Sequence, residues 1–362
     1  MIEIDVEPLR SMGLTPPVLQ HLYRSLFESS CEPPLRLMRL TEVHRETVRL
    51  HDGRVERGAR LLPRLARTLD EAGEAPAVGD WVVAGSDAHG DFWVHERLPP
   101  LTRLARRDAD GRRHAVVSNV DTALFVMGLD DDFNPRRLER YFTLVHDSGM
   151  LAVVVLSKAD AVAPATVACA LEALRGRMPA GVEVLTVDAR SVAAAQALAP
   201  WLGEGQTLVV LGSSGAGKST LTNTLLGCAR QDTGAVREHD SRGKHTTTAR
   251  SLHRLPGGAC LIDTPGLRAL RPDADAGGVA ASFADIEALA TRCRFRDCSH
   301  GDEPGCAVRT GVPADRLRNF HKLLREARRD SLTALQRREQ LALWKARGRA
   351  GHGRLKAKRG EA

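Results

Sequence analysis

The most constraining feature of this 362-residue sequence is a glycine-rich loop between an apolar stretch and a helical pattern. The loop runs Gly212-Ser213-Ser214-Gly215-Ala216-Gly217-Lys218-Ser219 and fits the pattern G-x-x-x-x-G-K-[ST]. The apolar stretch 207–211 precedes it, and a helix opens with Thr220-Leu221-Thr222. Small residues let the backbone curl so that successive N–H groups point at phosphate oxygens, and a helix N-terminus adds positive potential. The sequence therefore predicts a phosphate-binding loop after a buried strand, in preference to a chance glycine-rich turn.

Two further segments fit a phosphate and magnesium site. Lys218 is expected to reach the β- and γ-phosphates, and the Ser219 hydroxyl to coordinate Mg²⁺. Downstream, Asp263-Thr264-Pro265-Gly266 follows an apolar stretch. We expect Asp263 to hold the Mg²⁺ shell and the Gly266 N–H to turn toward a γ-phosphate, although D-T-P-G alone also fits a strand-ending turn.

An upstream motif indicates which base is bound. Ser157-Lys158-Ala159-Asp160 follows the apolar stretch 151–156 and resembles the guanine motif N-K-x-D, with Ser157 in place of Asn. In that motif the Asp carboxylate accepts from two guanine donors that adenine lacks, and the Lys stem covers the ring. Asp160 therefore predicts GTP as the nucleotide, while Ser157 weakens the expected link to the phosphate loop. An isolated S-K-x-D also fits a surface turn, and Val187-Asp188-Ala189 lacks the S-A-K expected of the next guanine-contacting loop.

The order of these motifs differs from that of most GTPases, in which the phosphate loop comes first and the guanine motif last. Here the guanine motif at 157–160 precedes the phosphate loop, and D-T-P-G at 263–266 comes last. Because sites of parallel sheets are assembled at strand carboxyl ends, joining the old termini and cutting elsewhere preserves the site. The sequence therefore predicts a circularly permuted GTPase whose second switch leads directly into the following domain.

The loop between these motifs holds candidate switch residues. Lys244-His245-Thr246-Thr247-Thr248 lies in a polar, glycine-containing stretch. We expect Thr247 or Thr248 to bind Mg²⁺ when the γ-phosphate is present, with a solvated turn as the alternative. Leu267 stands after D-T-P-G, where many GTPases keep a water-orienting Gln, so intrinsic hydrolysis should be slow and completed by a partner. His245 is a candidate supplementary catalytic group or a surface residue of the loop.

The rest of the pattern indicates a multidomain α/β protein. Between about 115 and 270, apolar and helical stretches alternate, which is typical of a parallel sheet covered by helices. Short apolar runs between turn signals at 36 to about 108 predict a small β-barrel or sandwich. Residues 1–35 show no clear pattern and fit either a helical or a flexible extension. The expected strands are 122–127, 151–156, 182–187, 207–211 and 259–262, and the expected helices are 135–146, 164–177, 192–202 and 218–226.

Four potential zinc ligands follow. Cys293, Cys298, His300 and Cys306 have the spacing C-x₄-C-x-H-x₅-C. Three thiolates and one imidazole complete a tetrahedral set with no open position for water, so we expect one structural Zn²⁺ rather than free cysteines or a redox pair. The remaining cysteines are scattered and are interpreted as packing residues: Cys31, Cys169, Cys228 and Cys260.

Charge and composition limit the location and the partners. The N-terminus lacks the pattern of a secretory signal, and no apolar run is long enough to span a bilayer, so a cytoplasmic protein is expected. Most of the net charge of +7 lies after Leu343, where seven Lys/Arg face Glu361 alone. That tail fits contact with nucleic acid or simple solubilisation.

Taken together, the permuted order, G-S-S-G-A-G-K-S-T, K-H-T-T-T, D-T-P-G and C-R-F-R-D-C-S-H…E-P-G-C resemble the ribosome small subunit-dependent GTPase A family from about residue 36 to 340. The resemblance implies an N-terminal OB-fold β-barrel, a central circularly permuted P-loop GTPase and a mainly helical zinc domain. It also implies a role in late maturation of the 30S subunit, with GTP hydrolysis stimulated by that subunit. Because such barrels commonly bind RNA, we expect contact with rRNA, and we expect a monomer without a membrane partner. GTP/GDP, Mg²⁺ and Zn²⁺ are the implied cofactors.

The expected segments are an N-terminal extension (1–35), an OB-fold-like barrel (36–110), the permuted GTPase domain (111–272), a zinc-binding helical domain (273–340) and a basic tail (341–362). Two functions of other classes also fit the residues. A P-loop ATPase or kinase would prefer adenine. A zinc-stapled RNA-binding module would carry only vestigial nucleotide hydrolysis.

Overall fold

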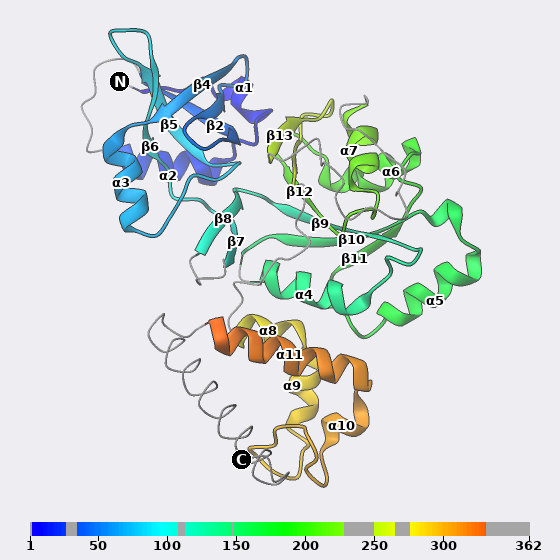
Figure 1. The fold of residues 1–362 in the computed structure, drawn as a ribbon. Helices are drawn as coiled ribbons and strands as arrows, with labels where there is room; N and C mark the ends of the chain where they lie inside the picture. Colours follow the sequence, from blue (N-terminus) through cyan, green and yellow to red (C-terminus); the bar gives the residue numbers. More distant parts are fainter. Residues whose placement is uncertain are drawn as a thin grey trace, which may run out of the picture.

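The computed structural model describes residues 2–26, 35–107, 113–146, 148–227, 250–264 and 276–330. Within these ranges the chain forms a β-barrel, a central sheet with helices on both faces, and a helical group beside one of those helices (Figure 1). The basic tail after Leu343 lies outside the described residues. Among those residues, no helix combines the length and the apolar character needed to cross a membrane.

The barrel is closed by five strands. β2 pairs with β3 and β5, β3 with β4, and β4 runs parallel to β6, which returns to β5. This is the OB-fold architecture that the family resemblance implied, and of the two architectures left open by the residue pattern, barrel or sandwich, it is the barrel. Its elements are β2 (Leu35–Val43), β3 (Val48–His51), β4 (Glu56–Leu61), α3 (Pro63–Glu71), β5 (Trp81–Ser86) and β6 (Phe92–Arg97).

The N-terminal extension packs onto the barrel. β1 (Ile2–Glu3) pairs in parallel with the start of β2, and α1 (Val6–Arg10) and α2 (Pro16–Leu26) follow. Five apolar side chains of this segment are at most 4% exposed and belong to the barrel's core: Leu9, Met12, Leu14, Val18 and Leu22. Sequence patterning missed this segment because α1 is only five residues long and two of the five lie in the turn between the helices.

The central sheet has the order β11-β10-β9-β12-β14-β13. The first five strands are parallel, as expected, whereas β13 (Ser251–Arg254) runs antiparallel to β14 and also pairs with β2 of the barrel. The sheet is therefore mixed rather than purely parallel. The other strands are β9 (Thr122–Gly128), β10 (Leu151–Ser157), β11 (Glu183–Thr186), β12 (Thr207–Leu211) and β14 (Cys260–Asp263), and a hairpin of β7 (Arg103–Arg107) and β8 (Arg113–Ser118) leads into them.

Alternating side chains of the buried strands form two separate cores. On β9, Phe125 and Met127 face α4 and α5, while Leu124 and Val126 face α6 and α7. Figure 1 shows these helix pairs on opposite sides of the sheet. The helices are α4 (Pro135–His146), α5 (Pro164–Leu174), α6 (Val192–Leu198) and α7 (Lys218–Leu226), with 3₁₀ turns at Ala159–Ala161 and Ala199–Trp201.

The C-terminal group packs beside α4 (Figure 1). The apolar side chains Leu317, Phe320, Leu323 and Ala327 of its long helix lie in the core of this group, where Phe283 packs against Phe320 with ring centroids 5.3 Å apart. Its helices are α8 (Ala276–Ser282), α9 (Ala284–Ala290), α10 (Ala307–Gly311) and α11 (Ala314–Asp330).

Candidate functional site

The glycine-rich loop joins β12 to α7. A Cβ on Gly212 would lie 2.2 Å from the carbonyl oxygen of Val126, so the loop leaves the sheet too close to β9 for any side chain. Gly217 precedes α7 with φ of +88°, a left-handed conformation that glycine adopts without strain. The Lys218 ammonium donates to the carbonyl oxygen of Ser213 at 2.5 Å. The loop thus folds tightly over the N-terminus of α7, where helix geometry favours an anion.

Ser157 connects the guanine-like segment to this loop. Its side chain is fully buried, and its hydroxyl donates to the carbonyl oxygen of Ala216 at 2.6 Å. A Cβ on Gly217 would lie 3.3 Å from the same hydroxyl oxygen, which shows how closely the two backbones approach. The serine hydroxyl thus makes the link that we had expected the replacement of Asn to weaken.

Lys158 has its own ion pair beside the loop. Its backbone has φ of +62°, and its ammonium lies 2.5 Å from Oδ2 of Asp130, a residue of the loop after β9. Partial burial alone would raise the pKa of Asp130, but the hydrogen bond from Lys158 and the backbone N–H of Asp132 outweigh it and lower that pKa. The Lys158 stem is therefore tethered across the carboxyl ends of β9 and β10.

Asp160 lies in the 3₁₀ turn after Lys158 and faces the loop that follows β11. Its Oδ2 accepts from Nη2 of Arg190 at 2.6 Å, and the backbone N–H of Ala159 donates to the carbonyl oxygen of Val187 at 3.2 Å. Arg190 also approaches Asp188, with Nε 3.4 Å from Oδ1. The hydrogen bonds to Asp160 and then Asp188 raise the pKa of Arg190. The segment 157–160 is thus held against both the phosphate loop and the loop after β11.

Asp263 ends β14, the strand next to β12. It is 5% exposed and pairs in register with Val210, two residues before Gly212. The hydroxyl of Thr264 donates to the carbonyl oxygen of Val210 at 2.7 Å, which fixes the chain as it leaves the strand. The remaining predicted residues of this site, Gly266, His245, Thr247 and Thr248, lie outside the described residues.

Sequence reasoning missed two carboxylates of the loop after β9. Besides Asp130, Asp132 accepts from the Ser213 hydroxyl at 2.5 Å and pairs with Nη1 of Arg137 at 2.8 Å. The signal was available, because three acidic residues, 130–132, follow Leu129 at the end of the apolar strand β9. Since β9 neighbours β12 in the sheet, this acidic run had to emerge beside the phosphate loop.

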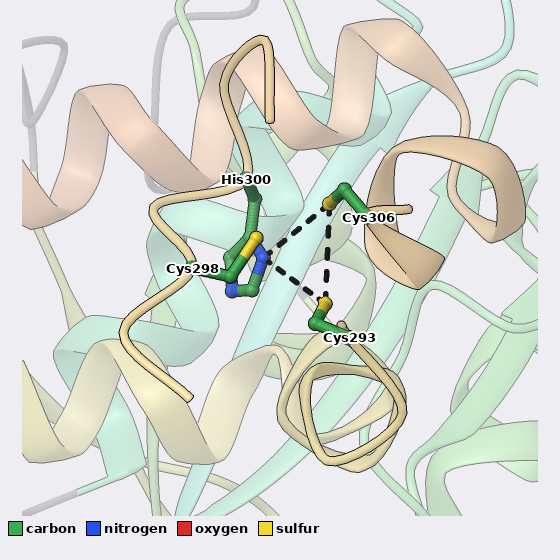
Figure 2. Close-up of side chains that lie close together, drawn as sticks. All are labelled: Cys293, Cys298, His300 and Cys306. Atoms are coloured by element: carbon green, nitrogen blue, oxygen red, sulfur yellow. Dashed lines mark hydrogen bonds between the residues drawn. The ribbon is translucent and has the colours of Figure 1, made fainter. Parts of the chain in front are cut away.

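The predicted zinc ligands converge on one point. Nδ1 of His300 lies 3.7 Å from Sγ of Cys293 and 3.6 Å from Sγ of Cys306, and the two sulfurs are 4.0 Å apart (Figure 2). With Cys298 included, all four ligand atoms lie within 4.8 Å of one another. Zinc bonds of about 2.0 Å to nitrogen and about 2.3 Å to sulfur place tetrahedral ligands roughly 3.5–3.8 Å apart. The donor set and its spacing fit a closed tetrahedral zinc site.

The other cysteines differ from one another. Cys260 is buried, as a packing residue should be, but Cys169 is exposed, so that interpretation is wrong for it. Cys31 and Cys228 lie outside the described residues.

Comparison with known proteins places these sites in context. The sequence pattern of the family described as "RsgA GTPase" matches residues 94–272. A protein of Xanthomonas oryzae pv. oryzae (strain MAFF 311018) named "Small ribosomal subunit biogenesis GTPase RsgA" is 48% identical over 273 residues, which cover 73% of each chain. A relative with the same name from Xanthomonas campestris pv. campestris (strain B100) is 48% identical over 262 residues, covering 72% of this chain and 70% of the relative.

Two solved structures share the fold. The crystal structure of YjeQ from Thermotoga maritima matches with a TM-score of 0.57 at 20% identity, over 81% of this chain and 98% of that chain. The crystal structure of YloQ, described as a circularly permuted GTPase, matches with a TM-score of 0.56 at 19% identity, over 84% of this chain and 99% of that chain. The motif order, the fold and the sequence identity agree, and this chain belongs to the RsgA GTPase family and is a circularly permuted enzyme that hydrolyses GTP.

Proposed function

We propose that this chain is a monomeric, cytoplasmic GTPase that acts in late maturation of the small (30S) ribosomal subunit, binds its rRNA and hydrolyses GTP faster when bound to it. The name shared by its relatives supports the choice of partner. The observation that carries the nucleotide part is the hydrogen bond from Ser157 to Ala216, because it holds the base-reading segment against the phosphate loop. One guanine nucleotide then reaches both.

In this proposal each part of the site has one task. The Asp160 carboxylate accepts from guanine, and the Lys158 stem covers the base. The N–H groups of residues 212–220 hold the phosphates, and Lys218 leaves the Ser213 carbonyl to contact the β- and γ-phosphates. Ser219 and Asp263 supply oxygen ligands to Mg²⁺, the donor type that this ion prefers. Thr247 or Thr248 adds a ligand, and the Gly266 N–H a γ-phosphate contact, in the GTP form.

Hydrolysis depends on the partner. Leu267 cannot orient water, and His245 is the candidate supplementary group. We therefore propose slow intrinsic turnover, completed when the subunit orders the switch segments.

A groove on the barrel supports contact with rRNA. It has a volume of about 410 Å³ and lies over β3, β4 and the start of β6. Arg60 supplies positive charge there, Arg49 is already paired with Glu56 at 2.7 Å and Glu42 at 3.5 Å, and Phe92 and Trp93 supply aromatic surface. Bases stack on aromatic rings and phosphates pair with guanidinium groups, and this strand face is the one that OB-folds use for oligonucleotides. We propose it, with the basic tail at 341–362, as an rRNA-binding surface.

The test of this function is GTP hydrolysis measured with and without purified 30S subunits. We expect stimulation of at least about tenfold, with 50S subunits as the matched ribosomal control and Lys218→Ala as the inactive control. Fast turnover without subunits, or equal turnover with 30S and 50S subunits, would contradict the proposal. Failure of Lys218→Ala to impair 30S maturation in cells would instead favour an RNA-binding module with vestigial hydrolysis.

The base assignment is tested separately. GDP should compete with a fluorescent guanine nucleotide far better than ADP does, and Asp160→Asn should weaken GDP binding by roughly tenfold or more, because a carboxylate that accepts two donors is replaced by an amide that accepts one. Equal competition by ADP would reject the assignment.

A further inference from the structure

Arg190 makes a direct contact with the carboxylate assigned to guanine. Its Nη2 lies 2.6 Å from Oδ2 of Asp160, and its guanidinium is held from the other side by Asp188, whose Oδ1 also accepts the backbone N–H of Arg190 at 3.0 Å. The Arg190 side chain is 71% exposed, whereas that of Asp160 is 32% exposed. The arginine therefore covers Asp160 from the solvent side of the site.

The chemistry of this contact matters because an arginine side chain and the donor edge of guanine carry the same group. In guanine, N1–H and the exocyclic amine are attached to the same carbon and form part of a guanidine unit. The arginine side chain ends in a guanidinium. Both donate parallel N–H bonds to a carboxylate. Reading guanine requires both oxygens of Asp160, and Oδ2 already accepts from Arg190.

We propose that Arg190 is an internal competitor of guanine, which must leave Oδ2 of Asp160 for the base to bind. The inference rests on the proposed assignment of Asp160 to guanine. Arg190 then sets the nucleotide affinity. When guanine binds, Asp160 loses its hydrogen bond from Arg190 and gains those from the base, so the net free energy of base recognition is smaller. Asp188 keeps Arg190 close after displacement, so the competition is intramolecular.

The sign of the effect separates competition from general electrostatics. Removing a positive charge near a nucleotide weakens attraction to its phosphates. Removing a competitor for Asp160 strengthens binding. Arg190→Ala should therefore bind GDP about two- to fivefold more tightly, the factor expected from an exposed ion pair. The gain should shrink toward nothing as salt is raised, because exposed pairs are screened.

The experiment is titration of the full-length protein with GDP by calorimetry, at low and high salt. Arg175→Ala is the matched control. Arg175 is a similarly exposed arginine of the same domain, and its guanidinium lies 2.9 Å from the carboxylate of Glu172, outside the nucleotide site. It should leave GDP affinity unchanged or slightly weaker. Arg190→Lys, which keeps the charge but loses the planar fork, should fall between wild type and Arg190→Ala.

A double variant and the possible contrary results decide the matter. In an Asp160→Asn background, Arg190→Ala should no longer tighten GDP binding. Weaker GDP binding by Arg190→Ala alone would mean that Arg190 positions Asp160 or contacts the base, and unchanged binding would mean that the pair does not compete; either result overturns the inference. If Asp160→Asn itself leaves GDP affinity intact, the base assignment fails instead, so the two failures are distinguishable.

Discussion

The Ser157 hydroxyl links two segments that are distant in the chain, the guanine-like segment 157–160 and the phosphate loop. It donates to the carbonyl oxygen of Ala216, a residue with no exposed surface. Ser157→Ala leaves this buried acceptor without its donor, at a cost of about 1–3 kcal/mol. We expect the phosphate loop to become less ordered, so that GDP binding must supply the free energy that orders it. A cost of ~1.4 kcal/mol weakens GDP binding about tenfold. GDP titration of the purified variant measures this.

Ser148→Ala is the matched control. The Ser148 hydroxyl is also buried and donates to a carbonyl oxygen, that of Val145, at 2.5 Å. It lies just before β10, at the amino ends of the parallel strands, whereas the phosphate loop lies at their carboxyl ends. This variant should lose a similar amount of stability in urea while keeping its GDP affinity. Equal weakening of GDP binding by both variants would show that Ser157 acts only through global stability.

At the scale of single elements, we expect the segment from Cys293 to Cys306 to depend on a bound metal. It contains no regular secondary structure, and its ends are held to the rest of the C-terminal group by the core around Phe283 and Phe320. A bound metal would add four bonds to the few hydrogen bonds of this segment, such as those from Arg294 N–H to the carbonyl oxygen of Gly305 at 3.1 Å and from Ser299 N–H to Glu303 at 3.0 Å. We expect one zinc per chain by elemental analysis and its loss in Cys298→Ser.

Loss of zinc should also lower the melting temperature of the C-terminal group and leave GDP binding by the central sheet nearly intact. Cys169→Ser is the matched control, because Cys169 is exposed and does not belong to the cluster. It should keep the metal. Zinc retained at full stoichiometry in Cys298→Ser would rule out the four-ligand site.

An element could be predicted from the sequence when its own residues carry the pattern, and not when its role depends on residues distant in the chain. α4 and β12 were predicted with their observed bounds, because one helical period or one apolar run spans the whole element. β13 was missed, since four residues with a single buried side chain, Leu252, give no alternation to detect. Asp130, Asp132 and Arg190 were missed because their roles arise from neighbours in the sheet, which are distant in the chain.

At the scale of the whole molecule, α4 joins the nucleotide site to the C-terminal group. Its Glu139 is 1% exposed and accepts from Nη1 of Arg316 and Nδ2 of Asn319, both at 2.6 Å. Arg316 also forms two hydrogen bonds with Asp285 and stacks over Phe283. Removing one partner of a buried pair costs about 3–5 kcal/mol. Arg316→Met should therefore release α11, seen as faster hydrogen exchange in residues 314–330 with unchanged exchange in β9 and β12.

Two control variants check this prediction, one at the buried ion pair and one at an exposed ion pair. Glu139→Leu combined with Arg316→Met removes both charges of this pair and leaves Arg177, which lies 3.4 Å from Glu139, with Asp315 at 2.9 Å as its partner. The double variant should recover part of the lost stability. Glu172→Gln removes an exposed partner of Arg175 and should change little. A double variant no more stable than Arg316→Met would mean that packing, rather than an unpaired charge, dominates this interface.

Arg39 connects the other three parts of the chain. Its guanidinium is fully buried and donates to the carbonyl oxygens of Met12 at 2.5 Å and Asn119 at 2.6 Å. It also donates to the carbonyl oxygen of Gly79 at 3.2 Å and to the Thr207 hydroxyl at 3.0 Å. The extension, the barrel, the segment entering β9 and the start of β12 therefore share one side chain. Burial lowers the pKa of Arg39, but a guanidinium remains charged at neutral pH.

Because these four acceptors surround a planar fork, charge alone cannot replace Arg39. In Arg39→Lys the ammonium donates from a single point and leaves several buried oxygens unpaired, at about 1–3 kcal/mol each. We expect a loss of at least about 3 kcal/mol in urea unfolding. Arg36→Lys, on the same strand with an exposed pair to Glu3, should change stability by less than about 1 kcal/mol. If Arg39→Lys were as stable as Arg36→Lys, strand pairing and apolar packing would suffice to hold the three parts together, and Arg39 would not be the contact that joins them.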